Sequence, residues 1–139
     1  MPEYLLAELT AKIIRSFYNV HQKLGPGFLE SIYKNALALD LENNGMEVEK
    51  EKPVEIFYNG ALVGTHRIDI LVNGTVIVEA KAVEQLNEKH KAQVISHLRA
   101  MDLDVGLLVN FANPELEFKR LENFYKHKTG KFGEESGGE

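Results

Sequence analysis

The sequence contains the stretch Arg67-Ile-Asp-Ile-Leu-Val-Asn-Gly-Thr-Val-Ile-Val-Glu-Ala-Lys81, in which β-branched and apolar residues surround one Asn-Gly pair. This composition predicts two buried strands joined by a hairpin turn. Besides Arg67 at its start, the stretch contains three charged side chains, those of Asp69, Glu79 and Lys81. A charge buried among such residues costs on the order of several kcal/mol unless it is paired or binds a cation. The three residues are therefore candidates for a functional site.

The same kind of pattern extends outward from this hairpin. Residues 48–58 also alternate with period two and end at Asn59-Gly60, which predicts a three-stranded antiparallel meander. The elements expected in chain order are helices at about 2–24 and 27–44, strands at 48–58, 62–72 and 75–81, a helix at 87–101 and a strand at 104–111. Residues 114–127 fit either a strand or a helix. This order predicts an α/β (α+β) fold, α-α-β-β-β-α-β, with helices on both sides of a mixed central sheet.

The spacing of apolar residues also predicts which side of each early helix faces the core. In the first helix one stripe is formed by Leu6, Leu9, Ile13, Phe17, Val20 and Leu24. In the second helix the expected core residues are Ile32, Ala36 and Leu39, together with Leu37 and Leu41.

With 139 residues, the chain has the length of one ordinary domain, expected over residues 1–128. The acidic segment 129–139 has no apolar residue after Phe132 and is expected to be disordered. There is no cysteine, no apolar stretch long enough for a membrane helix and no signal-peptide pattern at the start. These features predict a soluble protein of the cytoplasm that does not interact with membranes.

The net charge of -5 argues against a generally basic surface that coats nucleic acid. Three of the acidic residues belong to the terminal segment, so the rest of the chain is nearly neutral. Basic residues gather locally between 119 and 131: Lys119, Arg120, Lys126, Lys128 and Lys131. This group is either a patch that lies along a phosphate backbone or a solvated terminal segment.

The register of the hairpin decides whether Asp69 joins Glu79 and Lys81, which share a strand face because they are two residues apart. A two-residue turn at Asn73-Gly74 would place Asp69 opposite Val78, on the wrong face. A three-residue loop with a left-handed Gly74, or a bulge, would restore the parity by placing Asp69 opposite Ile77. We therefore predict an odd loop or a bulge.

With that register, two carboxylates and one ammonium group converge. Carboxylate oxygens are the ligands that Mg²⁺ and Mn²⁺ prefer, and such an ion activates water and neutralises a scissile phosphate. Lys81 would orient or help to deprotonate the attacking water, or stabilise the transition state. The alternative is a solvated cluster of charges on an exposed strand face.

Two motifs of the sequence resemble those of a known family. Asp69 and Glu79-Ala-Lys81 resemble the D…(D/E)xK core of the PD-(D/E)XK nuclease superfamily, and Gly27-Phe-Leu-Glu30-Ser-Ile-Tyr33 resembles the signature of its GxxExxY family. The similarity covers roughly Leu6 to Glu122. The D…ExK spacing alone is a weak signal, but together with the upstream signature it is specific.

The resemblance implies a restriction-endonuclease-like core and a set of site residues. Glu30, Asp69 and Glu79 would hold Mg²⁺ or Mn²⁺, with the Ala80 carbonyl as a further ligand, while Lys81 would be catalytic. Gln93 matches a glutamine that many members place near the site, and His97 stands where they have a tyrosine. Residues expected to contact the substrate are Tyr33, His97, Lys119 and Arg120.

The function implied is that of a magnesium-dependent nuclease acting on nucleic acid, with DNA as the expected substrate. The alternative is a non-catalytic module that keeps the fold and binds nucleic acid or a protein partner. Because the chain is small and carries no net positive charge, a homodimer or a protein partner is expected to supply further binding surface.

Overall fold

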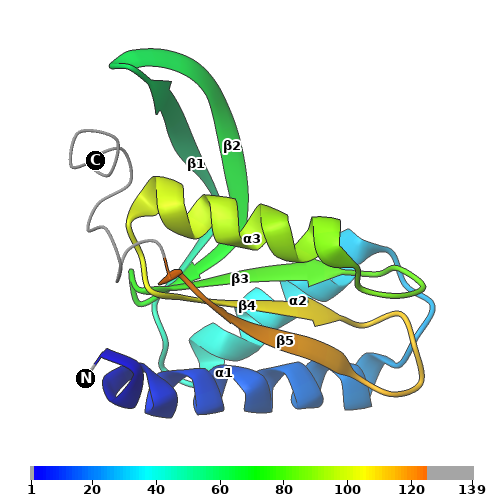
Figure 1. The fold of residues 1–139 in the computed structure, drawn as a ribbon. Coiled ribbons are helices and arrows are strands. Elements are labelled where there is room, and N and C mark those ends of the chain that lie inside the picture. The colour runs from blue at the N-terminus through cyan, green and yellow to red at the C-terminus, as the bar shows by residue number, and fades with distance from the viewer. Residues whose placement is uncertain (1, 125–139) are drawn as a thin grey trace.

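The computed structural model describes residues 2–124 and contains three helices and five strands over that range (Figure 1). The elements are α1 (Pro2–Leu24), α2 (Glu30–Asn43), β1 (Val48–Tyr58), β2 (Ala61–Val72), β3 (Val76–Lys81), α3 (Glu88–Met101), β4 (Val105–Asn110) and β5 (Glu117–Glu122). The expected order of elements is confirmed, and the ambiguous segment after Pro114 forms a strand. The disorder expected at 129–139 concerns residues outside the described range.

The five strands form one mixed sheet in the order β1-β2-β3-β4-β5. Neighbouring strands are antiparallel except β3 and β4, which run parallel and are connected through α3. Figure 1 shows α1 and α2 on one face of the sheet and α3 on the other. The predicted α/β class and the mixed central sheet are therefore confirmed.

Each face of the sheet has its own hydrophobic core. The core beneath α1 and α2 contains Ile13, Phe17, Tyr33, Leu37, Ile70, Val78 and Phe111, among others. The core beneath α3 is smaller and contains Val54, Ile68, Leu71, Ile77, Val94, Leu98 and Leu108, among others. The strands β3 and β4 are buried on both faces, as their nearly continuous apolar sequence predicted.

The second helix differs from its prediction at its start and in its buried side. It begins at Glu30 rather than near Gly27, which has a φ of 114° and lies in the preceding loop. The buried residues are Tyr33, Leu37, Ala38 and Leu41, whereas Ile32 and Leu39 are exposed. The prediction is thus confirmed for Leu37 and Leu41 and wrong for Ile32 and Leu39, because apolar residues occupy several sides of this helix.

The loop between β2 and β3 has the odd length that the sequence analysis predicted. Asn73 and Gly74 both have positive φ, the Thr75 N–H donates to the Val72 carbonyl at 3.0 Å, and pairing resumes at Val72 and Val76. The partner named for Asp69 was wrong, because Ile77 pairs with Leu71. The odd loop length was nevertheless predicted correctly. Asp69 and Leu71 are two residues apart, so the pairing of Leu71 with Ile77 has the same parity as the predicted pairing.

The hairpin of β1 and β2 extends beyond α3 (Figure 1), and its strands twist on the way. Ile70 packs in the core beneath α1 and α2, but Ile68 packs in the core beneath α3. Residues two apart on a regular strand share a face, so the face changes between these two positions. On β1, Glu51 has a φ of 53°, and the pairs on either side of it join Lys50 to Ile70 and Lys52 to Ile68.

Gly106 sets how closely α3 approaches β4. A Cβ atom at this position would lie 2.7 Å from Val94 Cγ1, a branched side chain with little freedom to move. We expect Gly106→Ala to lower the free energy of unfolding by about 1–3 kcal/mol because it overpacks this contact. Urea denaturation measures the change.

Gly64 provides the control, because a Cβ atom there meets no atom within 4 Å. Gly64→Ala should leave the stability nearly unchanged, and adding Val94→Ala to Gly106→Ala should recover part of the loss. Equal effects at the two glycines would contradict the packing explanation.

No helix within residues 2–124 is long and apolar enough to cross a membrane.

Candidate active site

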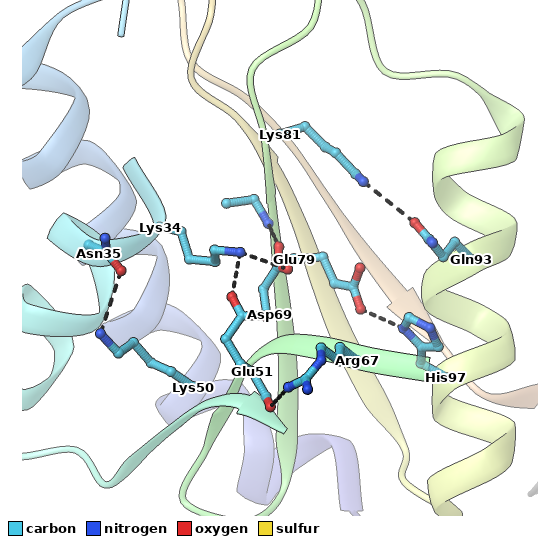
Figure 2. A network of polar contacts seen from close by, with 11 residues as sticks. Lys34, Asn35, Lys50, Glu51, Arg67, Asp69, Glu79, Lys81, Gln93 and His97 are labelled. Carbon is cyan, nitrogen blue, oxygen red and sulfur yellow. Dashed lines mark hydrogen bonds and ion pairs between the residues drawn. The ribbon is translucent and has the colours of Figure 1, made fainter. Parts of the chain in front are cut away.

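Asp69 lies where β2 separates from β3. The ladder between these strands runs from the turn to the pair Ile70 and Val78 and does not include Asp69, the residue next to Ile70. Beyond that point, Asp69 Oδ2 accepts a hydrogen bond of 2.9 Å from the N–H of Ala80 (Figure 2). Ala80 stands between Glu79 and Lys81, so the structure places the Asp69 carboxylate beside the Glu79-Ala-Lys81 segment.

Glu79 points toward α3 and is almost completely buried, with 3% of its surface exposed. Its Oε2 lies 2.6 Å from Nδ1 of His97, and Nε2 of His97 lies 3.0 Å from Nδ1 of His66. His97 is buried, whereas His66 is exposed on β2. His97 was expected from the sequence to contact substrate, but in the structure it is the partner of Glu79, and His66 was not among the predicted site residues.

Lys81 and Gln93 come from different elements and meet at the C-terminal end of β3. Lys81 Nζ lies 3.5 Å from Oε1 of Gln93, which α3 carries (Figure 2). Lys81 is half-buried. The amide oxygen of Gln93 therefore helps to fix the position of the lysine ammonium group.

Lys34 is a second cation at the site, and the sequence analysis did not predict it. It extends from α2, and its Nζ lies 2.5 Å from Oε2 of Glu51 and 3.5 Å from Oδ1 of Asp69 (Figure 2). Burial disfavours the charged ammonium group, but the hydrogen bond to Glu51 and the negative charge of Asp69 outweigh it, so the pKa of Lys34 is raised. A signal was present, because Lys34 follows Glu30 by four residues and so shares its side of the helix.

Glu30 and Tyr33 both belong to the start of α2 but have different surroundings. Tyr33 is fully buried; its hydroxyl donates to the Gly25 carbonyl at 2.5 Å and accepts from the N–H of Phe28 at 3.2 Å. Tyr33 thus closes the loop before α2, and the contact with substrate that the sequence suggested is not available to it. Within the described range, the Glu30 carboxylate has no hydrogen-bond or ion-pair partner.

The basic residues of β5 lie two strands away from β3 in the sheet. Arg120 forms an ion pair with Glu122, and both Lys119 and Arg120 are exposed. The other members of the basic group, Lys126, Lys128 and Lys131, fall outside the described residues. The structure therefore does not join Lys119 and Arg120 to the carboxylates of the site.

The chemistry of the side chains suits a hard divalent cation. Asp69 and Glu79 offer carboxylate oxygens, and Glu79 uses only Oε2 for its bond to His97. Mg²⁺ binds through one or two carboxylates and keeps several waters, so two such ligands suffice. Within residues 2–124, however, no three His, Cys, Asp or Glu residues are placed to hold a metal together, so Glu30 is not assembled with the other two.

Comparisons with known proteins agree with this fold. The family model of the PD-(D/E)XK nuclease superfamily matches residues 7–121. The crystal structure of SSO0001 aligns with a TM-score of 0.55 at 20% identity, covering 66% of this chain and 48% of that one. The chain thus spans about half the length of that protein, and the likeness concerns the fold alone. No curated protein matches.

Proposed function

The chain belongs to the PD-(D/E)XK nuclease superfamily, and from this we propose that it is a metal-dependent nuclease that hydrolyses phosphodiester bonds of nucleic acid. One observation carries the proposal. The Asp69 carboxylate accepts the N–H of Ala80, the residue between Glu79 and Lys81, so all three charged groups border the point where β2 leaves β3. A carboxylate pair beside a lysine is the arrangement that the reaction needs.

Each of these residues has its own part in the reaction. Asp69 and Glu79 would hold the metal, and the carbonyl of Ala80 would add a ligand. Glu30, one turn from Lys34 on α2 and without a partner in the described chain, is the third carboxylate that the resemblance assigns to the metal. Bound Mg²⁺ or Mn²⁺ supplies an acidified water and neutralises charge on the phosphate. The arrangement provides both a nucleophile and a site for the developing charge.

Lys81 is the proposed catalytic side chain. Its ammonium group orients the attacking water and donates a hydrogen bond to the phosphate oxygen on which charge develops. Gln93 accepts from Lys81 at 3.5 Å and keeps the ammonium group at the end of β3. Gln93 is thus a positioning residue in this proposal.

The motif Gly27, Glu30 and Tyr33 supports a finer assignment to the GxxExxY family. The three residues lie in the loop that leads into α2 and in the first turn of that helix. Tyr33 closes the loop through Gly25 and Phe28, which fixes the direction in which α2 and its Glu30 start. The motif therefore has a structural reason as well as a chemical one.

DNA is the proposed substrate, and a second copy or a protein partner adds binding surface. The net charge of -5, which is nearly neutral only without the acidic terminal segment, limits the chain's unaided affinity for a phosphate backbone. Sedimentation of the protein alone, and with DNA, measures the assembly that forms.

Removal of the metal tests the function directly. Purified protein is incubated with single-stranded, double-stranded and branched DNA and with RNA, in Mg²⁺, in Mn²⁺ or in a chelator. We expect cleavage only with a divalent metal. Mn²⁺ should also raise the melting temperature, because it binds the folded state selectively.

The cleavage assay also distinguishes a nuclease from a non-catalytic binding module. Metal binding and nucleic-acid binding without cleavage of any substrate would favour a non-catalytic binding module. A melting temperature that does not respond to Mn²⁺ would contradict the proposed metal site.

A further inference from the structure

Lys34 connects two carboxylates at the proposed metal site. Its ammonium group lies between Glu51 of β1 and Asp69 of β2, and 16% of its side chain is exposed. The two contacts are unequal: 2.5 Å to Glu51 and 3.5 Å to Asp69. Lys34 therefore has a close partner and a looser one, and the looser one is a proposed metal ligand.

Glu51 is placed for this contact by an unusual backbone. Its φ of 53° is uncommon for a residue other than glycine. Its carbonyl accepts a hydrogen bond of 3.1 Å from Arg67 Nη1, and the strand pairs on both sides of it are regular. These contacts hold Glu51 across from Asp69 at the twist of the hairpin, where Lys34 reaches both carboxylates.

Lys34 and a divalent cation compete for the Asp69 carboxylate. Asp69 Oδ2 already accepts a hydrogen bond of 2.9 Å from the N–H of Ala80, so Oδ1, which Lys34 contacts at 3.5 Å, is the less engaged oxygen. A half-buried ammonium group without a partner would be costly. Because Glu51 is the closer partner, Lys34 loses only its longer contact if a metal takes Asp69.

We infer that Lys34 is the built-in counter-ion of the metal site: it neutralises Asp69 before metal binds and is held by Glu51 alone once a divalent cation occupies Asp69. The inference rests on the proposed function and describes how that site is regulated. Metal binding then includes the displacement of one ammonium contact, and Glu51 sets how readily that contact is lost.

Calorimetric titration of the intact protein with Mn²⁺ tests this competition. Lys34→Met removes the competing cation and should tighten Mn²⁺ binding by about tenfold, as expected for one charge within contact distance. Glu51→Gln weakens the alternative partner of Lys34 and should make Mn²⁺ bind about threefold more weakly, because Lys34 then stays on Asp69.

Charge alone would produce changes of the same sign, so the double variant is decisive. In the Lys34→Met background no ammonium group can return to Asp69, so Glu51→Gln should have no more effect than Glu49→Gln. Lys50→Met, on the same strand as Glu51, removes one positive charge whose ammonium group lies near Asn35 and forms no ion pair within residues 2–124. It should change Mn²⁺ affinity by much less than Lys34→Met.

A second measurement covers variants of reduced stability. Without metal, Lys34→Met should melt at a lower temperature than the wild type, and Mn²⁺ should raise its melting temperature by more. An unchanged Mn²⁺ constant in Lys34→Met, or strictly additive effects of the two substitutions, would overturn the inference alone. Failure of the wild type to bind Mn²⁺ would overturn the proposed function and the inference with it.

Discussion

Replacing Lys81 by alanine is expected to reduce metal-dependent cleavage by roughly a thousandfold, the size of effect produced by removing a group that assists proton transfer or stabilises charge in the transition state. Lys81 Nζ lies 3.5 Å from Gln93 Oε1 at the end of β3, and Lys81 follows Glu79 by two residues on that strand. The ammonium group is not a proposed metal ligand, so the Mn²⁺ constant should not weaken. The rate of cleavage under single-turnover conditions measures the loss.

The matched control for this variant is Lys89→Ala, which removes the same charge from an exposed position on α3. It should retain nearly the wild-type rate, and Gln93→Ala should show an intermediate loss with Mn²⁺ binding intact. Cleavage that persists in Lys81→Ala would indicate a contaminating nuclease. A loss of similar size in Lys89→Ala would mean that the charge of the surface, and not the position of Lys81, determines the rate.

The sequence predicted the strands and turns well because their signals are local. Asn59-Gly60 and Asn73-Gly74 adopt positive φ values, which few other residue pairs tolerate, and they mark both hairpins. The odd loop followed from requiring charged residues to share a face. The buried side of α2 was predicted only in part, with Leu37 and Leu41 correct, because it also depends on the neighbouring Phe111, on which Tyr33 stacks at 4.9 Å.

The candidate site was predictable only in part, for a similar reason. Asp69, Glu79 and Lys81 stand out because they are charges within apolar strands. Lys34 and Glu51 lie on polar segments where charge is ordinary, and their meeting depends on the twist of the hairpin. Such a twist leaves no trace in a period-two pattern, so contacts between elements at this point appear only in the folded chain.

The bond between Glu79 and His97 gives the largest expected effect on stability. Both side chains are buried, and the two atoms lie 2.6 Å apart. His97→Phe fills a similar space but leaves the carboxylate without this partner. Removing one member of a buried pair costs about 3–5 kcal/mol, so the free energy of unfolding in urea should fall by that amount.

Comparison with other variants separates the loss of this bond from a general disturbance of α3. His97→Gln restores a donor and should recover part of the loss, while His66→Phe changes an exposed ring and should cost far less. Mn²⁺ should reduce the difference in the free energy of unfolding between His97→Phe and the wild type, because a cation at Glu79 replaces the missing partner. If His97→Phe unfolds at the wild-type urea concentration, the Glu79 carboxylate does not depend on His97, and its burial needs another explanation. If Mn²⁺ stabilises every variant equally, Glu79 is not a ligand, and the metal is held at this end of the sheet without it.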